Sequence, residues 1–234
     1  MKISFEQYCA DFSRYGLSLN REQYEQFDEY SSFLIEYNNS VNLTAITDPV
    51  EIMYKHFLDS SLVLKYVDIP ENSTIIDVGT GAGFPSVPIK IMRPDLRITL
   101  LDSLNKRIEF LRQLCDKIGI RAVFLHGRAE DYSKLPEFRE IFDFSCARAV
   151  ANFSVLSELC LPFVKVGGKF LSMKGPNEDI SGAENAVSLL GGSIQSDEMY
   201  ELESEKRRII IVGKISQTPT KYPRNSAQIK KKPL

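Results

Sequence analysis

A glycine-rich stretch at residues 75–85 constrains the fold of this chain more than any other feature. It reads Ile-Ile-Asp-Val-Gly-Thr-Gly-Ala-Gly-Phe-Pro, which predicts a buried strand, a tight turn and the start of a helix. Glycine is needed where the backbone turns sharply or approaches a ligand closely. The stretch is therefore typical of the first strand–turn–helix unit of an α/β fold that binds a nucleoside-containing cofactor.

The spacing of the glycines separates two classes of cofactor. A dinucleotide fingerprint needs G-x-G-x-x-G, because the pyrophosphate sits against the N-terminus of the following helix. Here the glycines are Gly79, Gly81 and Gly83, an acid precedes them at Asp77, and the last fingerprint position is occupied by Phe84. This G-x-G-x-G spacing indicates a loop that binds S-adenosylmethionine, which carries no phosphate. The alternative is a tight turn that binds nothing.

Polar residues follow three further predicted strands and belong to the same end of the sheet. Asp102 ends the second strand, where a carboxylate can accept hydrogen bonds from both ribose hydroxyls. Ala129 and Glu130 follow the third strand and are expected to contact adenine. Arg148 follows the fourth strand and is expected either to hold the carboxylate of the cofactor or to orient the site. The alternatives are a helix cap for Asp102, an acidic first helical turn for Glu130 and a surface cation for Arg148.

The rest of the chain predicts an α/β fold with a doubly wound, mostly parallel seven-stranded sheet and an N-terminal helical segment. Short apolar runs alternate with helical periodicity after about residue 73. We expect residues 1–70 to form helices packed on the core, residues 71–214 the cofactor-binding core, and residues 215–234 a basic tail. The predicted strands are 74–78, 97–101, 121–125, 142–146 and 169–173, followed by an antiparallel pair at 193–202 and 207–212. Helices are predicted to begin near residues 84, 104, 153 and 178, and a third N-terminal helix is predicted from Asp48-Pro49 to about Tyr66.

The charge distribution indicates a polyanionic partner. The whole chain has a formal net charge of -2, but the segment from Lys214 to Leu234 contains basic residues and no acid. A positive tail on an acidic body is typical of proteins that contact nucleic acid. A disordered, solubilising terminus is the alternative.

Composition argues against several other classes of protein. No apolar run approaches the roughly 18 residues of a membrane span, and the N-terminus does not resemble a secretory signal, so we expect a cytoplasmic protein with no membrane partner. The four cysteines form no C-x-x-C pair and the chain has only two histidines, so no metal site is expected. The oligomeric state is not predicted.

Taken together, these motifs resemble the ribosomal RNA small subunit methyltransferase G family, also called the glucose-inhibited division protein B family. The resemblance covers nearly the whole chain and implies a class I methyltransferase (Rossmann-like) fold. It also implies methyl transfer from S-adenosylmethionine to N7 of a guanine in 16S ribosomal RNA, with Gly79, Phe84, Ala129, Glu130 and Arg148 contacting the cofactor. The ordered set of matching motifs is Asn42-Leu43-Thr44, His56-Phe57-Leu58-Asp59-Ser60, the glycine loop with Phe84-Pro85, Leu101-Asp102-Ser103-Leu104-Asn105-Lys106-Arg107, Arg128-Ala129-Glu130, Ser145-Cys146-Ala147-Arg148-Ala149 and Lys174-Gly175.

We expect His56, Lys174 and the tail with Arg224 to contact 16S ribosomal RNA or the small ribosomal subunit. An exposed polar helix face is the alternative for His56. No catalytic residue is predicted, because guanine N7 has a free lone pair and no proton to lose, and an in-line methyl transfer depends mainly on alignment. Two other functions remain open: a methyltransferase acting on a small molecule would share every cofactor residue, and a nicotinamide-dependent oxidoreductase would share the fold class but is disfavoured by Phe84.

Overall fold

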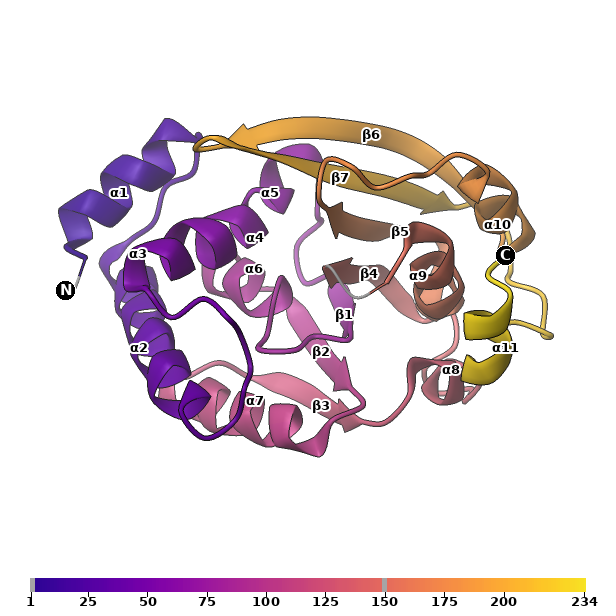
Figure 1. Cartoon of the computed structure of the whole chain (residues 1–234), viewed down its shortest axis with the longest axis horizontal. Helices are drawn as coiled ribbons and strands as arrows, with labels where there is room; N and C mark the ends of the chain where they lie inside the picture. Colours follow the sequence, from indigo (N-terminus) through magenta and orange to yellow (C-terminus); the bar gives the residue numbers. More distant parts are fainter. Residues whose placement is uncertain (1–2, 149–150) are drawn as a thin grey trace.

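The computed structural model describes residues 3–148 and 151–234, and it contains the predicted doubly wound sheet (Figure 1). The seven strands lie in the order β3-β2-β1-β4-β5-β7-β6. Strands β1 to β5 are parallel, whereas β7 runs antiparallel to both of its neighbours, β5 and β6. The strand bounds are β1 Thr74–Val78, β2 Arg97–Asp102, β3 Ala122–His126, β4 Phe142–Arg148, β5 Val164–Lys174, β6 Gly192–Leu202 and β7 Glu205–Lys214.

Helices cover both faces of the sheet because successive residues of a buried strand point to opposite sides. In β1, Ile75 belongs to one buried apolar cluster and Ile76 to the other. The first cluster contains the apolar faces of α6 and α7 together with the N-terminal helices, and the second contains those of α9 and α10 (Figure 1). These helices are α6 Ser86–Met92, α7 Asn105–Lys117, α8 Ala129–Tyr132, α9 Phe153–Cys160 and α10 Ala183–Leu189.

The N-terminal helix α2 (Arg21–Asn38) packs against the glycine loop, and α1 (Phe5–Arg14) packs on α2. A capping box is present at the start of α2, with the side chains of Asn20 and Gln23 each hydrogen-bonded to the other's backbone amide. The ring of Tyr30, on α2, stacks on Phe84 at 5.5 Å between centroids, and its hydroxyl donates to the Ala82 carbonyl at 2.5 Å. The N-terminal segment therefore fixes the position of the loop that follows β1.

The third N-terminal helix differs from the prediction, because it is not one regular helix. It consists of α3 (Pro49–Ile52), a π-helix at Met53–Leu58, α4 (Asp59–Ser61) and α5 (Val63–Tyr66). Wider π turns occur frequently at functional sites. Here the π turn and the start of α4 carry His56 and Asp59, which are only 9% and 4% exposed. The alternative for His56, an exposed polar helix face, is therefore wrong, because both side chains are buried.

The chain after β5 also differs in detail from the prediction. The predicted antiparallel pair is confirmed: β6 and β7 form a hairpin at the edge of the sheet, with β7 paired to β5 and β6 outermost. Helix α10 begins at Ala183, five residues after the predicted start, because Gly182 adopts a left-handed conformation (φ +81°) immediately before it. Glu178 lies outside the helix, where its carboxylate accepts a hydrogen bond from the Phe153 amide at 2.6 Å.

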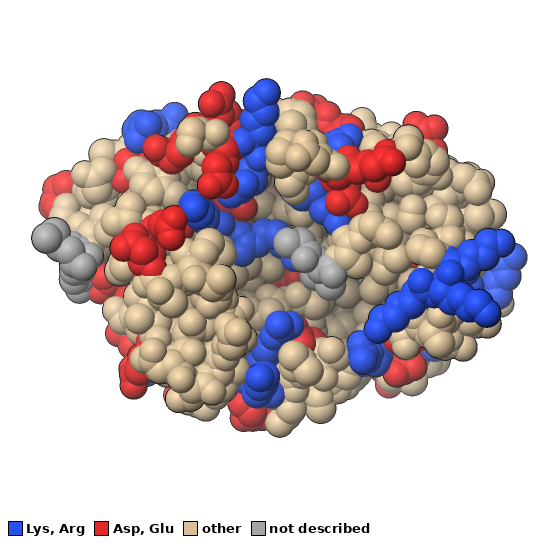
Figure 2. Space-filling view, viewed as in Figure 1, with Lys and Arg blue, Asp and Glu red and all other residues tan. Residues whose placement is uncertain are grey.

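The basic tail folds back onto the core. It contains α11 (Ser226–Lys231), and its Tyr222 and Ile229 are buried. The guanidinium of Arg224 forms an ion pair at 2.6 Å with Glu158, which has no exposed surface. Lys230, Lys231 and Lys232 are exposed, and Figure 2 shows basic side chains gathered over this end of the molecule.

We predict that Arg224→Ala lowers the free energy of unfolding by about 3 kcal/mol, because it leaves the buried Glu158 carboxylate without its counter-charge. Lys230→Ala, at an exposed position in the same tail, is the control and is expected to stay within about 0.5 kcal/mol of wild type. Urea denaturation of both variants measures the difference. Equal stability of the two variants would mean that the ion pair between Arg224 and Glu158 does not stabilise the fold.

Candidate active site

The glycine loop lies where the strand order reverses, between β1 and β4, and this is where ligands bind in open α/β sheets. Gly79 and Gly81 have positive φ values of 72° and 60°. Below them, Asp77 is fully buried and accepts hydrogen bonds from the Thr80 hydroxyl at 2.9 Å and the Ser86 amide at 3.2 Å. Burial raises the pKa of Asp77 to about 7.

Two adjoining pockets open above this loop. The larger, the glycine-loop pocket, has a volume of about 420 Å³. The smaller has a volume of about 100 Å³ and shares Gly79, Asp102 and Ser103 with the first. The structure brings all seven predicted cofactor residues to these two pockets: Gly79, Gly81, Phe84, Asp102 and Arg148 line the larger, and Ala129 and Glu130 line the smaller.

Asp102 connects the glycine loop to the end of β2. Its carboxylate accepts hydrogen bonds from the amides of Gly81 (3.0 Å) and Leu104 (2.9 Å) and from the guanidinium of Arg107 (3.2 Å). The bond to Leu104 resembles the cap that was the alternative to ribose binding. A carboxylate offers about four acceptor sites, so one site remains, and ribose binding stays a prediction.

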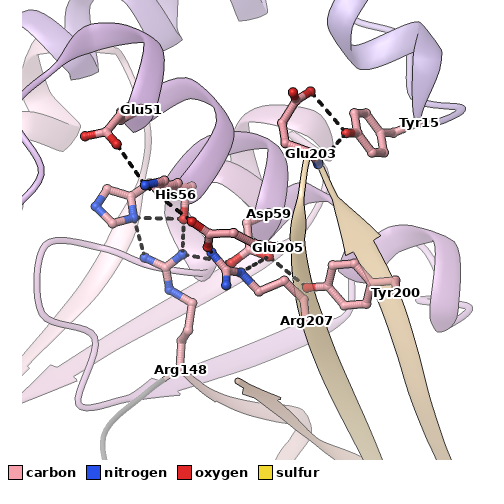
Figure 3. A network of polar contacts seen from close by, with 10 residues as sticks. Tyr15, Glu51, His56, Asp59, Arg148, Tyr200, Glu203, Glu205 and Arg207 are labelled. Carbon is pink, nitrogen blue, oxygen red and sulfur yellow. Dashed lines mark hydrogen bonds and ion pairs between the residues drawn. The ribbon is translucent and has the colours of Figure 1, made fainter. Parts of the chain in front are cut away.

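Arg148 is the centre of a polar network that joins three distant parts of the chain (Figure 3). Its guanidinium donates to the Lys55 carbonyl (3.0 Å) and the Asp59 carboxylate (3.2 Å), and it also faces His56 Nδ1 (3.0 Å). It lies over the ring of Phe84, 4.7 Å from the centroid. Asp59 also accepts from the Tyr200 hydroxyl at 2.8 Å and lies 3.7 Å from Arg207 Nε. This network links the π turn, the end of β4 and the β6–β7 hairpin.

His56 is a neutral positioning residue in this network. Its burial, followed by the charge of Arg148, lowers its pKa to about 3. Nδ1 faces the Arg148 guanidinium, which can only donate, so Nδ1 accepts this hydrogen bond. Arg148 also donates a hydrogen bond to the neighbouring Lys55 carbonyl. The ring proton therefore belongs on Nε2, which lies 3.1 Å from the Thr44 hydroxyl. The ring stacks on Phe84 at 4.4 Å between centroids. Both ring nitrogens are therefore engaged.

We predict a pH-dependent stability difference between wild type and His56→Gln. The folded-state pKa of His56 lies below its unfolded value of 6.5, so the unfolded chain takes up the proton first and stability is lost as the pH falls. Between about pH 7.5 and pH 5, wild type should lose ~2 kcal/mol of unfolding free energy relative to the variant. Asp77 titrates in both proteins and cancels from the comparison. Urea denaturation at both pH values measures this difference, and a pH-independent difference would contradict the assignment.

A second pocket, the hairpin pocket, lies on the other side of Arg148 and His56. Its volume is about 420 Å³, and these two residues line both this pocket and the glycine-loop pocket. Figure 2 shows a hollow in the centre of this face, with lysine and arginine side chains around it. The remaining lining residues come from the segment of residues 46–59, the end of β5 and the residue after it, and the hairpin: Ile46, Lys55, Asp59, Met173, Lys174, Gly175, Tyr200, Glu205 and Arg207.

The structure brings together two of the three residues predicted to contact RNA and places the third elsewhere. His56 and Lys174 line the hairpin pocket, whereas Arg224 lies in the tail and pairs with Glu158. The ammonium of Lys174 bonds to the Ala151 carbonyl and lies 3.3 Å from Glu178. The sequence did not point to Tyr200, Glu205 or Arg207, because nothing in their local pattern distinguishes them from other residues of an edge hairpin.

Comparison with known proteins decides the family. A family model described as rRNA small subunit methyltransferase G matches residues 23–210. Two relatives are named ribosomal RNA small subunit methyltransferase G: the protein from Clostridium beijerinckii is 50% identical, with 94% of each chain covered, and the protein from Clostridium botulinum is 46% identical, with 97% of each chain covered. The chain belongs to this family. The similarity to this methyltransferase G family extends through the N-terminal helices and the hairpin as well as the cofactor-binding core.

Solved structures confirm the class I methyltransferase fold. A methyltransferase from Pyrococcus furiosus superimposes with a TM-score of 0.56 at 14% identity, covering 80% of this chain and 97% of that one. An S-adenosylmethionine-dependent methyltransferase from Aquifex aeolicus gives a TM-score of 0.53 at 18% identity, covering 70% of this chain and 93% of that one. Within the described residues, no helix is long and apolar enough to cross a membrane, and no cluster of three or more metal-ligand side chains is present.

Proposed function

We propose that this chain transfers a methyl group from S-adenosylmethionine to N7 of a guanine in 16S ribosomal RNA. Membership of the methyltransferase G family supports ribosomal RNA of the small subunit as the substrate, and hence action in the cytoplasm. The observation that carries the proposal is the wall formed by Arg148 and His56, which is shared by the glycine-loop pocket and the hairpin pocket. A cofactor on one side of this wall and a base on the other would be neighbours.

The glycine-loop pocket suits S-adenosylmethionine better than a dinucleotide. A Cβ added at Gly81 would meet only the Gly79 carbonyl, at 4.0 Å, so the loop leaves open space for a ligand. The Gly81 amide, which a phosphate would need, already donates to Asp102. A pyrophosphate here would therefore face a carboxylate, which argues against a nicotinamide cofactor. S-adenosylmethionine supplies an electrophilic methyl group on a sulfonium.

The residues around the two pockets position the reactants and remove no proton. Guanine N7 needs no deprotonation, and His56 is neutral with both ring nitrogens hydrogen-bonded. The role of these residues is alignment, which can supply roughly 7–11 kcal/mol in favourable cases.

This mechanism predicts a single-turnover rate that is nearly independent of pH when cofactor and RNA are both saturating. We expect a change of less than about threefold between ~pH 6 and ~pH 8.5, because no side chain has to lose a proton in the chemical step. Rapid-quench measurement of methyl transfer across this range tests the prediction. A general base would instead reveal itself as a rate that falls about tenfold for each pH unit below its pKa.

The substrate is tested with ribosomes from cells that lack this protein. Purified enzyme and labelled S-adenosylmethionine are incubated in parallel with naked 16S RNA, precursor particles, assembled small subunits and a small-molecule extract. We expect label in 16S RNA, and mass mapping should place it on a single guanine as 7-methylguanine. Label confined to the small-molecule extract would favour the alternative methyltransferase function.

A further inference from the structure

We infer that Glu205, at the rim of the hairpin pocket, accepts hydrogen bonds from the Watson–Crick edge of the target guanine. The inference rests on the proposed function and adds how guanine is distinguished from other bases. Glu205 is the first residue of β7 and lines the hairpin pocket but not the glycine-loop pocket. It therefore belongs to the part of the hairpin pocket that the hairpin itself contributes.

The carboxylate of Glu205 is charged and accessible. Its Oε2 lies 2.5 Å from Arg207 Nη2 and its Oε1 lies 3.4 Å from Lys55 Nζ, and 43% of the side chain is exposed. The hydrogen bond and charge of Arg207 lower its pKa, so the group is ionised at neutral pH. With about four acceptor sites on a carboxylate, each oxygen can accept a further hydrogen bond.

The other carboxylate of the hairpin pocket, that of Asp59, is buried and already hydrogen-bonded through both oxygens. Asp59 is 4% exposed, and its two oxygens accept from Tyr200 and from Arg148. Removing it from these partners would leave buried charges unpaired, which is costly. Among the described lining residues, Glu205 is therefore the carboxylate that can bind a base without breaking the network.

Guanine presents complementary chemistry in a fixed direction. Its N1–H and N2 amine form two adjacent donors, which match the two oxygens of one carboxylate, whereas adenine presents an acceptor at N1. N7 lies on the opposite edge of the purine and has to face the glycine-loop pocket for the reaction. The Watson–Crick edge then points away from the wall of Arg148 and His56, toward the hairpin.

The same contact would strengthen during the reaction. The N7 lone pair forms a bond to the methyl carbon as the sulfur–carbon bond breaks, and that bond's electron pair stays on sulfur. One positive charge therefore moves from the sulfonium to the guanine ring, and the N1–H and N2–H groups become stronger donors. Hydrogen bonds that strengthen as charge develops raise the rate as well as the affinity.

The test combines Glu205→Gln with inosine, which retains N7 and N1–H but lacks the N2 amine. A synthetic 16S RNA fragment that the wild-type enzyme methylates is prepared with guanosine or with inosine at the target position. In wild type, inosine should lower kcat/KM by about tenfold, as expected for the loss of one hydrogen bond to a charged group. In Glu205→Gln, kcat/KM for guanosine should fall by about tenfold, and the preference for guanosine over inosine should shrink to about twofold or less.

Glu201→Gln is the matched control, because Glu201 is an exposed carboxylate on β6 of the same hairpin and does not line the pocket. It should keep the wild-type preference, and calorimetry should give the same S-adenosylmethionine affinity for all three proteins. A wild-type preference in Glu205→Gln, or no preference in wild type, would overturn the inference. Absence of methylation of any 16S RNA substrate by wild type would instead overturn the proposed function.

Discussion

Arg148→Ala is expected to lower the rate of RNA methylation by at least about 100-fold, comparable to the loss of one preorganised donor in other active sites. The guanidinium separates the two pockets, lies on Phe84 and bonds to both His56 and Asp59. Without the guanidinium of Arg148, the side chains of His56 and Phe84 lose the contacts that hold them between the two pockets. Arg148→Lys keeps the positive charge but not the planar guanidinium with its several fixed donors, so its rate of methylation should still be about tenfold below wild type. Rapid-quench methyl transfer and calorimetry with S-adenosylmethionine measure the two variants.

Loss of folding has to be separated from loss of alignment in this experiment. Arg148→Ala also leaves the Asp59 carboxylate buried with less compensation, so the double variant Arg148→Ala/Asp59→Asn removes that charge and should recover stability without recovering the rate. Arg208→Ala is the control, because its side chain is also 14% exposed and ion-paired but lines neither pocket. Wild-type activity in the double variant would show that Arg148 only supports the fold.

The cofactor side of the site could be predicted because each of its residues is encoded locally. Gly79, Asp102, Glu130 and Arg148 each follow a predicted strand, and parallel strands bring their carboxyl ends to one edge of the sheet. Strand periodicity and glycine spacing are properties of short windows, so a single sequence reveals them. The clustering of these residues could therefore be expected once a mostly parallel sheet was predicted.

The hairpin pocket could not be predicted in the same way. It depends on contacts between residues far apart in the sequence, such as Arg148 with Asp59 and Tyr200 with Asp59. The π turn that contains the buried His56 has no local signature in the sequence, so the sequence left an exposed polar helix face open as an alternative for this residue. The positive charge of the tail can be read from the sequence. The packing of the tail cannot, because it depends on an ion pair between Arg224 and the buried Glu158, which are far apart in the sequence.

Gly83→Ala is expected to lower the free energy of unfolding by about 3 kcal/mol or more, although Gly83 is not predicted to contact the cofactor. Its φ of +102° is unfavourable for alanine, which costs roughly 1–2 kcal/mol. The new Cβ would also lie 2.7 Å from the Tyr30 hydroxyl and 2.9 Å from a Val87 methyl, and such overpacking costs about 1–3 kcal/mol. Tyr30 cannot yield easily, because it is fully buried and bonded to the Ala82 carbonyl.

Two other glycines separate the contributions to this effect. Gly119 also has a positive φ (+68°), but a Cβ added there would meet no atom within 4 Å. Gly119→Ala should therefore lower the free energy of unfolding by only about 1 kcal/mol. Gly81→Ala (φ +60°) should also cost about 1 kcal/mol, but its Cβ enters the open space of the glycine-loop pocket, so S-adenosylmethionine affinity should fall by about tenfold or more. Urea denaturation and calorimetry distinguish these cases. If Gly83→Ala were no less stable than Gly119→Ala, the close packing of α2 against the loop would not be what holds the loop in place.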